Sequence, residues 1–162
     1  MKHAITIKLA NNPLRINSRL YGKSHKKQGN KQLVLFIDLS ELPPAELIPK
    51  QGYLFIYMND KEVSCKVIYK SNIENPHDYD KGYPIVFEIN SSSEEGLKLF
   101  GEPQELNYIK KKNEWLFFQY DPLFMEDMPL FQTLDGYVYL MLPNSTMNPV
   151  DFSKAYVVID RT

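Results

Sequence analysis

The sequence predicts an α+β fold that is mainly antiparallel β-sheet, built from two similar β-rich repeats with a few short helices. Aromatic residues make up 13% of the chain, with 11 Tyr and 9 Phe, a composition that favours strands. Short apolar runs alternate with turns rich in Pro, Gly and Asn. The connections between these runs are too short for systematic parallel crossovers, so the pairing is expected to be antiparallel.

Four strands are predicted in the first part of the chain. Residues 5–9 alternate apolar and polar side chains, which is typical of a half-buried strand. Residues 33–37 form an unbroken apolar run, as in a strand covered on both faces. Residues 53–58 and 63–69 flank an Asn-Asp-Lys turn and are predicted to form an antiparallel hairpin.

Four more strands are predicted in the second part, at 85–89, 115–120, 137–142 and 155–159. The helices are expected to be few and short. One fits around 45–48, between prolines that limit its length. Another is expected from Ser92, because Glu95 three residues later completes a capping box ahead of apolar residues.

An internal repeat is predicted over approximately 18–70 and 97–160, joined by a polar linker and one strand at 71–96, within a single domain of residues 1–162. Each copy has a glycine turn, a basic loop, a strand, a Pro-containing connector, a second glycine and two further strands. Leu20-Tyr21-Gly22 corresponds to Leu99-Phe100-Gly101 in this alignment. The alternative is two unrelated hairpin systems that share ordinary strand composition.

Composition and charge narrow the classes of partner. The net charge is −1 and the isoelectric point about 6.3, so bulk electrostatics give no reason to expect a nucleic-acid partner. Cys65 is the single cysteine, which excludes an internal disulfide and fits a reducing compartment. The N-terminal residues lack the apolar run of a secretory signal, and no run approaches the roughly 20 apolar residues of a membrane span. We therefore expect a cytoplasmic protein with no membrane partner, and no motif calls for a cofactor.

Two basic loops are candidate partner or ligand surfaces. Each lies between a glycine turn and a buried strand, and an acidic partner or a phosphate-bearing ligand would suit them. The alternative is that they are solvated loops, since neither has the glycine spacing of a phosphate cradle. The residues concerned are Lys23, His25, Lys26 and Lys27 in the first loop, and Lys110, Lys111 and Lys112 in the second.

Asp38 and Asp121 end the two equivalent strands. Two carboxylates that meet across a cleft can perform acid–base chemistry. The alternative is that each aspartate caps the turn that follows its strand.

Other reactive side chains give weaker indications. His77, Asp78 and Asp80 lie close together in the polar linker, but one histidine and two carboxylates in such a segment are a weak metal signal. Cys65 falls in a predicted strand, and no histidine base can be assigned to it from the sequence. The sequence therefore identifies no catalytic or metal-binding residues.

The blocks that carry the repeat also resemble the YwqG-like family, a domain of unknown function found in bacterial proteins. The similarity covers roughly 18–159, and its specificity comes from the order and spacing of strand and turn residues. Compared with the family pattern, the chain has a shorter N-terminal segment and a shorter middle. The matching blocks are 18–23, 34–43, 49–57, 99–103, 115–121, 136–140 and 151–154.

The resemblance implies a bacterial protein, and it transfers no established activity. Members of the family often occur near toxin systems. We therefore expect a non-catalytic protein-interaction or binding module, of an immunity-like and toxin-associated kind, whose partner is a toxin-like protein or a second copy of itself. The alternative is a small-molecule-binding protein or hydrolytic enzyme with its site between the two repeats.

Overall fold

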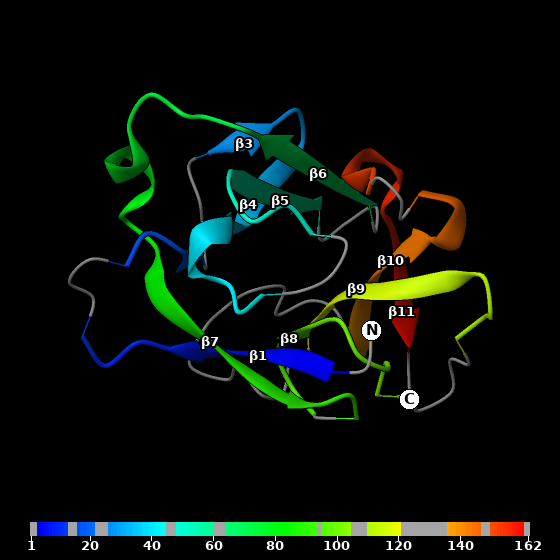
Figure 1. The fold of residues 1–162 in the computed structure, drawn as a ribbon. Helices are drawn as coiled ribbons and strands as arrows, with labels where there is room; N and C mark the ends of the chain where they lie inside the picture. The colour runs from blue at the N-terminus through cyan, green and yellow to red at the C-terminus, as the bar shows by residue number, and fades with distance from the viewer. Residues whose placement is uncertain are drawn as a thin grey trace.

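The computed structural model describes residues 3–12, 16–21, 26–44, 48–59, 64–93, 95–104, 110–120, 136–146 and 150–160. Its strands form one antiparallel sheet with the order β11-β10-β9-β8-β1-β7-β2-β4-β5-β6, and β3 pairs with β4 as an added hairpin (Figure 1). The strands of the described residues are β1 (His3–Leu9), β2 (Arg19–Leu20), β3 (Lys27–Gln28), β4 (Lys31–Asp38), β5 (Tyr53–Asn59), β6 (Ser64–Lys70), β7 (Tyr83–Ser91), β8 (Lys98–Leu99), β9 (Glu114–Tyr120), β10 (Tyr137–Pro143) and β11 (Tyr156–Asp160).

The prediction of an α+β fold is wrong, because the structure is nearly all antiparallel β-sheet. The helical segments of the described residues are 3-10 turns of three or four residues. The helix predicted from Ser92 is instead a turn followed by β8, since Gly96 has a positive φ of 85° and Leu97 to Leu99 are all buried. The 3-10 turns are η1 (Leu39–Glu41), η2 (Pro76–Tyr79), η4 (Asn144–Thr146) and η5 (Phe152–Lys154).

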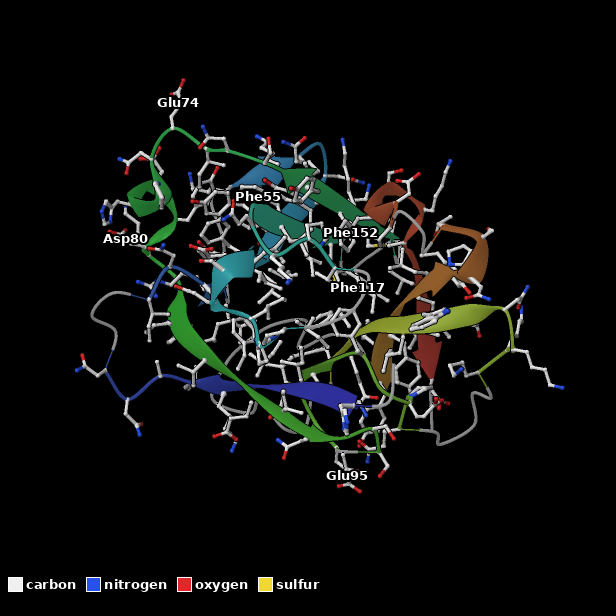
Figure 2. All side chains as sticks on the ribbon, in the orientation of Figure 1. Phe55, Glu74, Asp80, Glu95, Phe117 and Phe152 are labelled. Carbon is white, nitrogen blue, oxygen red and sulfur yellow. The ribbon has the colours of Figure 1, made fainter. Side chains whose placement is uncertain are left out.

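The sheet curves until its two terminal strands, β6 and β11, approach each other, which gives a nearly closed, barrel-like shape. The gap is bridged beside η5, where the Cys65 thiol lies 3.5 Å from the carbonyl oxygen of Ala155. Phe152 of η5 fills the interior behind this contact, with its ring centroid 5.4 Å from that of Phe117 (Figure 2). A three-residue turn therefore helps to close the curved sheet.

One apolar core fills the interior and draws residues from both ends of the sheet. Alternation along the strands selects its members: Leu54 and Ile56 of β5 point into this core, whereas Phe55 between them is buried in a second apolar cluster on the opposite face of the sheet. The core therefore fastens the two predicted repeats together. Its most buried members include Ile5, Ile7, Leu20, Leu35, Ile37, Leu54, Ile56, Ile85, Leu99, Phe117, Val138 and Leu140.

The strand order has the same pattern when followed outward from its centre in either direction. β1 and β7 pair in the middle, and the next strand on each side is a two-residue strand followed by three long ones. β1 lies beside β8, and β7 lies beside β2. The first strand of each half, β1 or β7, therefore pairs with the two-residue strand of the other half.

The two halves also share register. β4 carries a bulge at Val34 and β9 carries one at Phe117, each opposite the following long strand. The backbone N–H of Tyr21 donates to Val34 O at 3.0 Å, and that of Phe100 donates to Phe117 O at 3.2 Å. The correspondence includes β1 and β7, which lie outside the repeats assigned from sequence. That the two halves arose by duplication stays a prediction.

Candidate functional site

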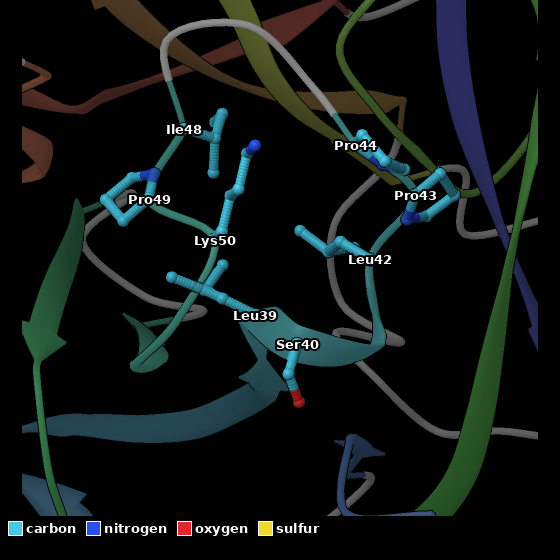
Figure 3. Close-up of a pocket in the computed structure, with 8 residues that line it drawn as sticks. All are labelled: Leu39, Ser40, Leu42, Pro43, Pro44, Ile48, Pro49 and Lys50. Carbon is cyan, nitrogen blue, oxygen red and sulfur yellow. The ribbon is translucent and has the colours of Figure 1, made fainter.

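The described residues form a pocket of about 210 Å³ in the connection from β4 to β5. Figure 3 shows Pro43 and Pro44 on one side and Pro49 on the other, with Ile48 and Lys50 between them. The pocket is lined by Leu39, Ser40, Leu42, Pro43, Pro44, Ile48, Pro49 and Lys50.

Asp38 shapes the floor of this pocket by capping η1. Its Oδ1 accepts hydrogen bonds from the backbone N–H of Ser40 at 3.0 Å and from Ser40 Oγ at 2.6 Å. These bonds turn the Ser40 hydroxyl away from the pocket, while Leu39 beside it is buried. The capping interpretation is confirmed for Asp38, whereas Asp121 lies outside the described residues.

A second carboxylate ties this turn to the start of β2. Glu41 accepts hydrogen bonds from the backbone N–H groups of Asn17 at 2.6 Å and Ser18 at 2.9 Å. The Asn17 side-chain amide donates to Asp38 Oδ2 at 2.9 Å. Asp38 and Glu41 therefore accept hydrogen bonds from the backbone and from neighbouring side chains, and these bonds hold the turn beside the pocket in place.

The side chains that line the pocket are apolar apart from Ser40, whose hydroxyl points away from it, and Lys50. Proline fixes its own φ, so three of the lining residues have little backbone freedom to lose on binding. Lys50 is exposed and extends beside buried Ile48, with its amino group at the end of the pocket drawn uppermost in Figure 3. The arrangement suits an apolar group with a neighbouring negative charge.

The structure does not bring the described lysines of the two basic loops onto one surface. β4 and β9 run in opposite directions in the sheet, so the residues that precede them lie at opposite ends of the strands. Lys26 and Lys27 lie at the end of the sheet where β4 begins. Lys110, Lys111 and Lys112 lie at the opposite end, where β9 begins. Lys23 and His25 lie outside the described residues.

The described lysines of these loops also differ in their surroundings. Lys26 Nζ lies 4.4 Å from the ring centroid of Tyr79, a cation–π contact. Lys110 Nζ is 3.6 Å from a carboxylate oxygen of Glu102, whereas Lys27, Lys111 and Lys112 are exposed. Their role as a partner or ligand surface stays a prediction.

Cys65 is half-buried and its thiol is held in the neutral form. Burial raises the pKa of Cys65 to about 11, and the charge of Lys31 offsets this only in part. Because the thiolate is the nucleophilic form, this environment disfavours nucleophilic chemistry near neutral pH.

The linker residues His77 and Asp78 belong to η2, which Asn75 caps by accepting a hydrogen bond from the His77 backbone N–H at 3.1 Å. Within the described ranges, no three His, Cys, Asp or Glu side chains are placed to hold a metal ion.

The expected position of a site between the two halves does not match the pocket. The pocket belongs to one connector of the first half, and the described side chains between the halves pack into the shared core. The sequence did carry a signal for the pocket, namely three prolines within the segment that follows a buried strand. By themselves, these prolines predict only a limit on helix length.

The scan against known protein families matches no family, and no curated protein matches the chain. The resemblance to YwqG-like proteins therefore stays a prediction. In the part of the chain that the structure describes, no helix has the length and apolar character needed to cross a membrane.

Proposed function

We propose that this chain is a protein-interaction module that binds an apolar side chain of another protein in the proline-walled pocket after β4. The observation that carries the proposal is a pocket lined by three prolines beside a turn that Asp38 caps, since prolines have little backbone freedom to lose on binding. Its volume of about 210 Å³ is smaller than the roughly 300–1,000 Å³ of sites for drug-sized molecules. This size favours a single side chain over a large cofactor.

The partner's chemistry follows from the lining. Apolar walls favour an aliphatic or aromatic side chain, and Lys50 favours a carboxylate next to it in the partner's sequence. Among the described residues that line the pocket, Lys50 is the one that carries a charge, and this positive charge sets the preference for an anionic neighbour.

The test uses a random peptide library displayed on phage and selected on the immobilised protein. We expect enriched peptides to carry an apolar residue beside Asp or Glu. A labelled peptide of this kind should bind Lys50→Glu about tenfold more weakly in fluorescence anisotropy, because the rim charge is reversed. Lys66→Glu, which reverses an exposed charge on β6, is the matched control and should bind normally.

Selected peptides without this pattern, or peptides that bind Lys50→Glu as tightly as the wild type, would contradict the proposal. The resemblance adds a finer expectation, that the partner is a toxin-like protein or a second copy. That expectation rests on the resemblance alone. Co-expression with a neighbouring toxin tests it, since immunity requires both protection and a complex.

A further inference from the structure

Arg19 and Lys98 occupy the same place in the two halves of the sheet. Arg19 of β2 lies between Phe36 of β4 and Pro84 of β7. Lys98 of β8 lies between its partner strands β9 and β1 in the same way. Both cations are buried, with exposed fractions of 7% for Arg19 and 0% for Lys98. The second half therefore provides an internal comparison for the first.

Lys98 is surrounded by hydrogen-bond acceptors. Its Nζ donates to the carbonyl oxygens of Ser92 at 3.1 Å and Glu102 at 2.6 Å. Beside it on β9 is Gln119, whose side chain bonds to the backbone of Gly96 and Gln104. A buried ammonium group needs such acceptors to replace the water it has lost.

Arg19 lacks an equivalent set. Its Nη1 donates to Ser18 O at 3.3 Å, and its Nε, although shielded from water, has no hydrogen-bond partner. The residue opposite it on β4 is Phe36, which offers no hydrogen-bonding side chain where the other half has Gln119. No ion pair of the described residues includes Arg19.

The nearest acidic groups along the chain are already engaged. Asp38 binds Ser40 and Asn17, and Glu41 binds the backbone at Asn17 and Ser18. Gly82 packs so closely on β2 that an added Cβ would lie 2.9 Å from Arg19 Cβ. The arginine stem is therefore held in place, while its guanidinium group has unused donors.

We propose that the guanidinium group of Arg19 binds a small oxyanion, a carboxylate or a phosphate, through its Nε edge. An arginine can donate two parallel hydrogen bonds from Nε and Nη2 to such a group, a geometry that lysine cannot reproduce. The low exposure of Arg19 limits the ligand to a single terminal oxyanion group. This site is separate from the proline-walled pocket and does not depend on the proposed function.

The chain has three arginines, so its arginine Nε–H signals can be resolved by ¹H–¹⁵N NMR and assigned with Arg19→Lys. We expect the Arg19 signal to shift saturably when inorganic phosphate or acetate is titrated at constant ionic strength. Saturation with only one of the two anions identifies the ligand as a phosphate or a carboxylate. Lys50→Glu should leave this response unchanged, which separates the anion site from the peptide pocket.

Arg19→Met, which removes the charge but keeps much of the side-chain volume, gives a second readout. We expect it to unfold at the same temperature as wild type or higher without anion, and to lose the rise in Tm that the bound anion gives the wild type. Two outcomes would overturn the proposal. One is an Arg19 signal that has not shifted when the anion concentration reaches about 50 mM. The other is that all three arginine signals shift together without saturation. If Arg19→Met does not fold, the wild-type titration alone decides.

Discussion

The sequence around Asp38 allows two interpretations of this side chain. A carboxylate at the end of a buried strand is compatible with catalysis or with capping. In the structure it is 7% exposed, and its two oxygens accept hydrogen bonds from Ser40 and Asn17. Those bonds make the aspartate part of the platform beneath the pocket.

Replacing Asp38 with alanine should destabilise the protein by about 2–3 kcal/mol, because the cap is lost and buried donors remain without acceptors. Denaturant unfolding followed by fluorescence measures the change. Asp151→Ala is the matched control, since Asp151 caps η5 through Ser153 with the same geometry but is exposed. The control should lose less stability, and equal losses for the two variants would contradict this account.

Side-chain roles were the least predictable part of the site. Capping by Asp38 follows from local sequence, because the acceptor and the donor at Ser40 are two residues apart. The burial of Arg19 does not, because it depends on Phe36 and Pro84, which neighbour it only after the sheet has formed. Composition and spacing therefore gave no reason to select Arg19.

At the scale of single elements, the hairpin of β5 and β6 depends on Gly52. Its φ is 107°, and a Cβ there would lie 2.6 Å from Tyr69 Cε2 and 2.9 Å from Lys70 O. The Gly52 carbonyl also accepts a hydrogen bond from Leu39 N at 3.0 Å, so the glycine joins the pocket turn to the hairpin. Gly136 has a comparable φ of 118° before β10.

Gly52→Ala should cost more than about 2 kcal/mol, because backbone strain and a collision with β6 act together. Gly29→Ala is the control: its φ of 61° is also positive, but nothing lies within 4 Å of the added Cβ. Strain alone should cost about 1 kcal/mol there. Thermal unfolding of both variants measures the difference, and similar Tm values would show that the collision is relieved cheaply.

The long strands were predictable from sequence because their apolar patterns are local. Residues 33–37 and 53–58 lie within β4 and β5, and 115–120 within β9. The short strands were not, because two residues carry no period, and β8 exists only through pairing with β1 and β9. The capping-box pattern from Ser92 failed for the same reason, since tertiary pairing overrode it.

At the scale of the whole molecule, the two halves depend on each other, because β1 and β7 each pair with strands of the other half. β1 pairs with β7 and β8, so both of its neighbours come from the other half. The shared core adds apolar contacts across the same junction. Neither half has a complete sheet without the other.

Fragments 1–81 and 82–162, cut in the exposed turn before β7, should each lack cooperative unfolding as isolated monomers. Mixed in equal amounts, they should recover the circular dichroism and unfolding transition of the intact chain, because the missing strand partners are then supplied. Analytical ultracentrifugation checks that the recovered species contains one copy of each fragment. A fragment that folds alone as a monomer would contradict this dependence.

The position of β1 also has a consequence during synthesis of the chain. Among the strands of this sheet, β1 leaves the ribosome first, yet its partner β7 is complete only at Ser91. At roughly 5–20 residues per second, this implies a wait on the order of 4–16 seconds with an unpaired strand. The unpaired strand is therefore exposed over this interval, and the speed of translation through residues 10–91 sets how long the interval lasts.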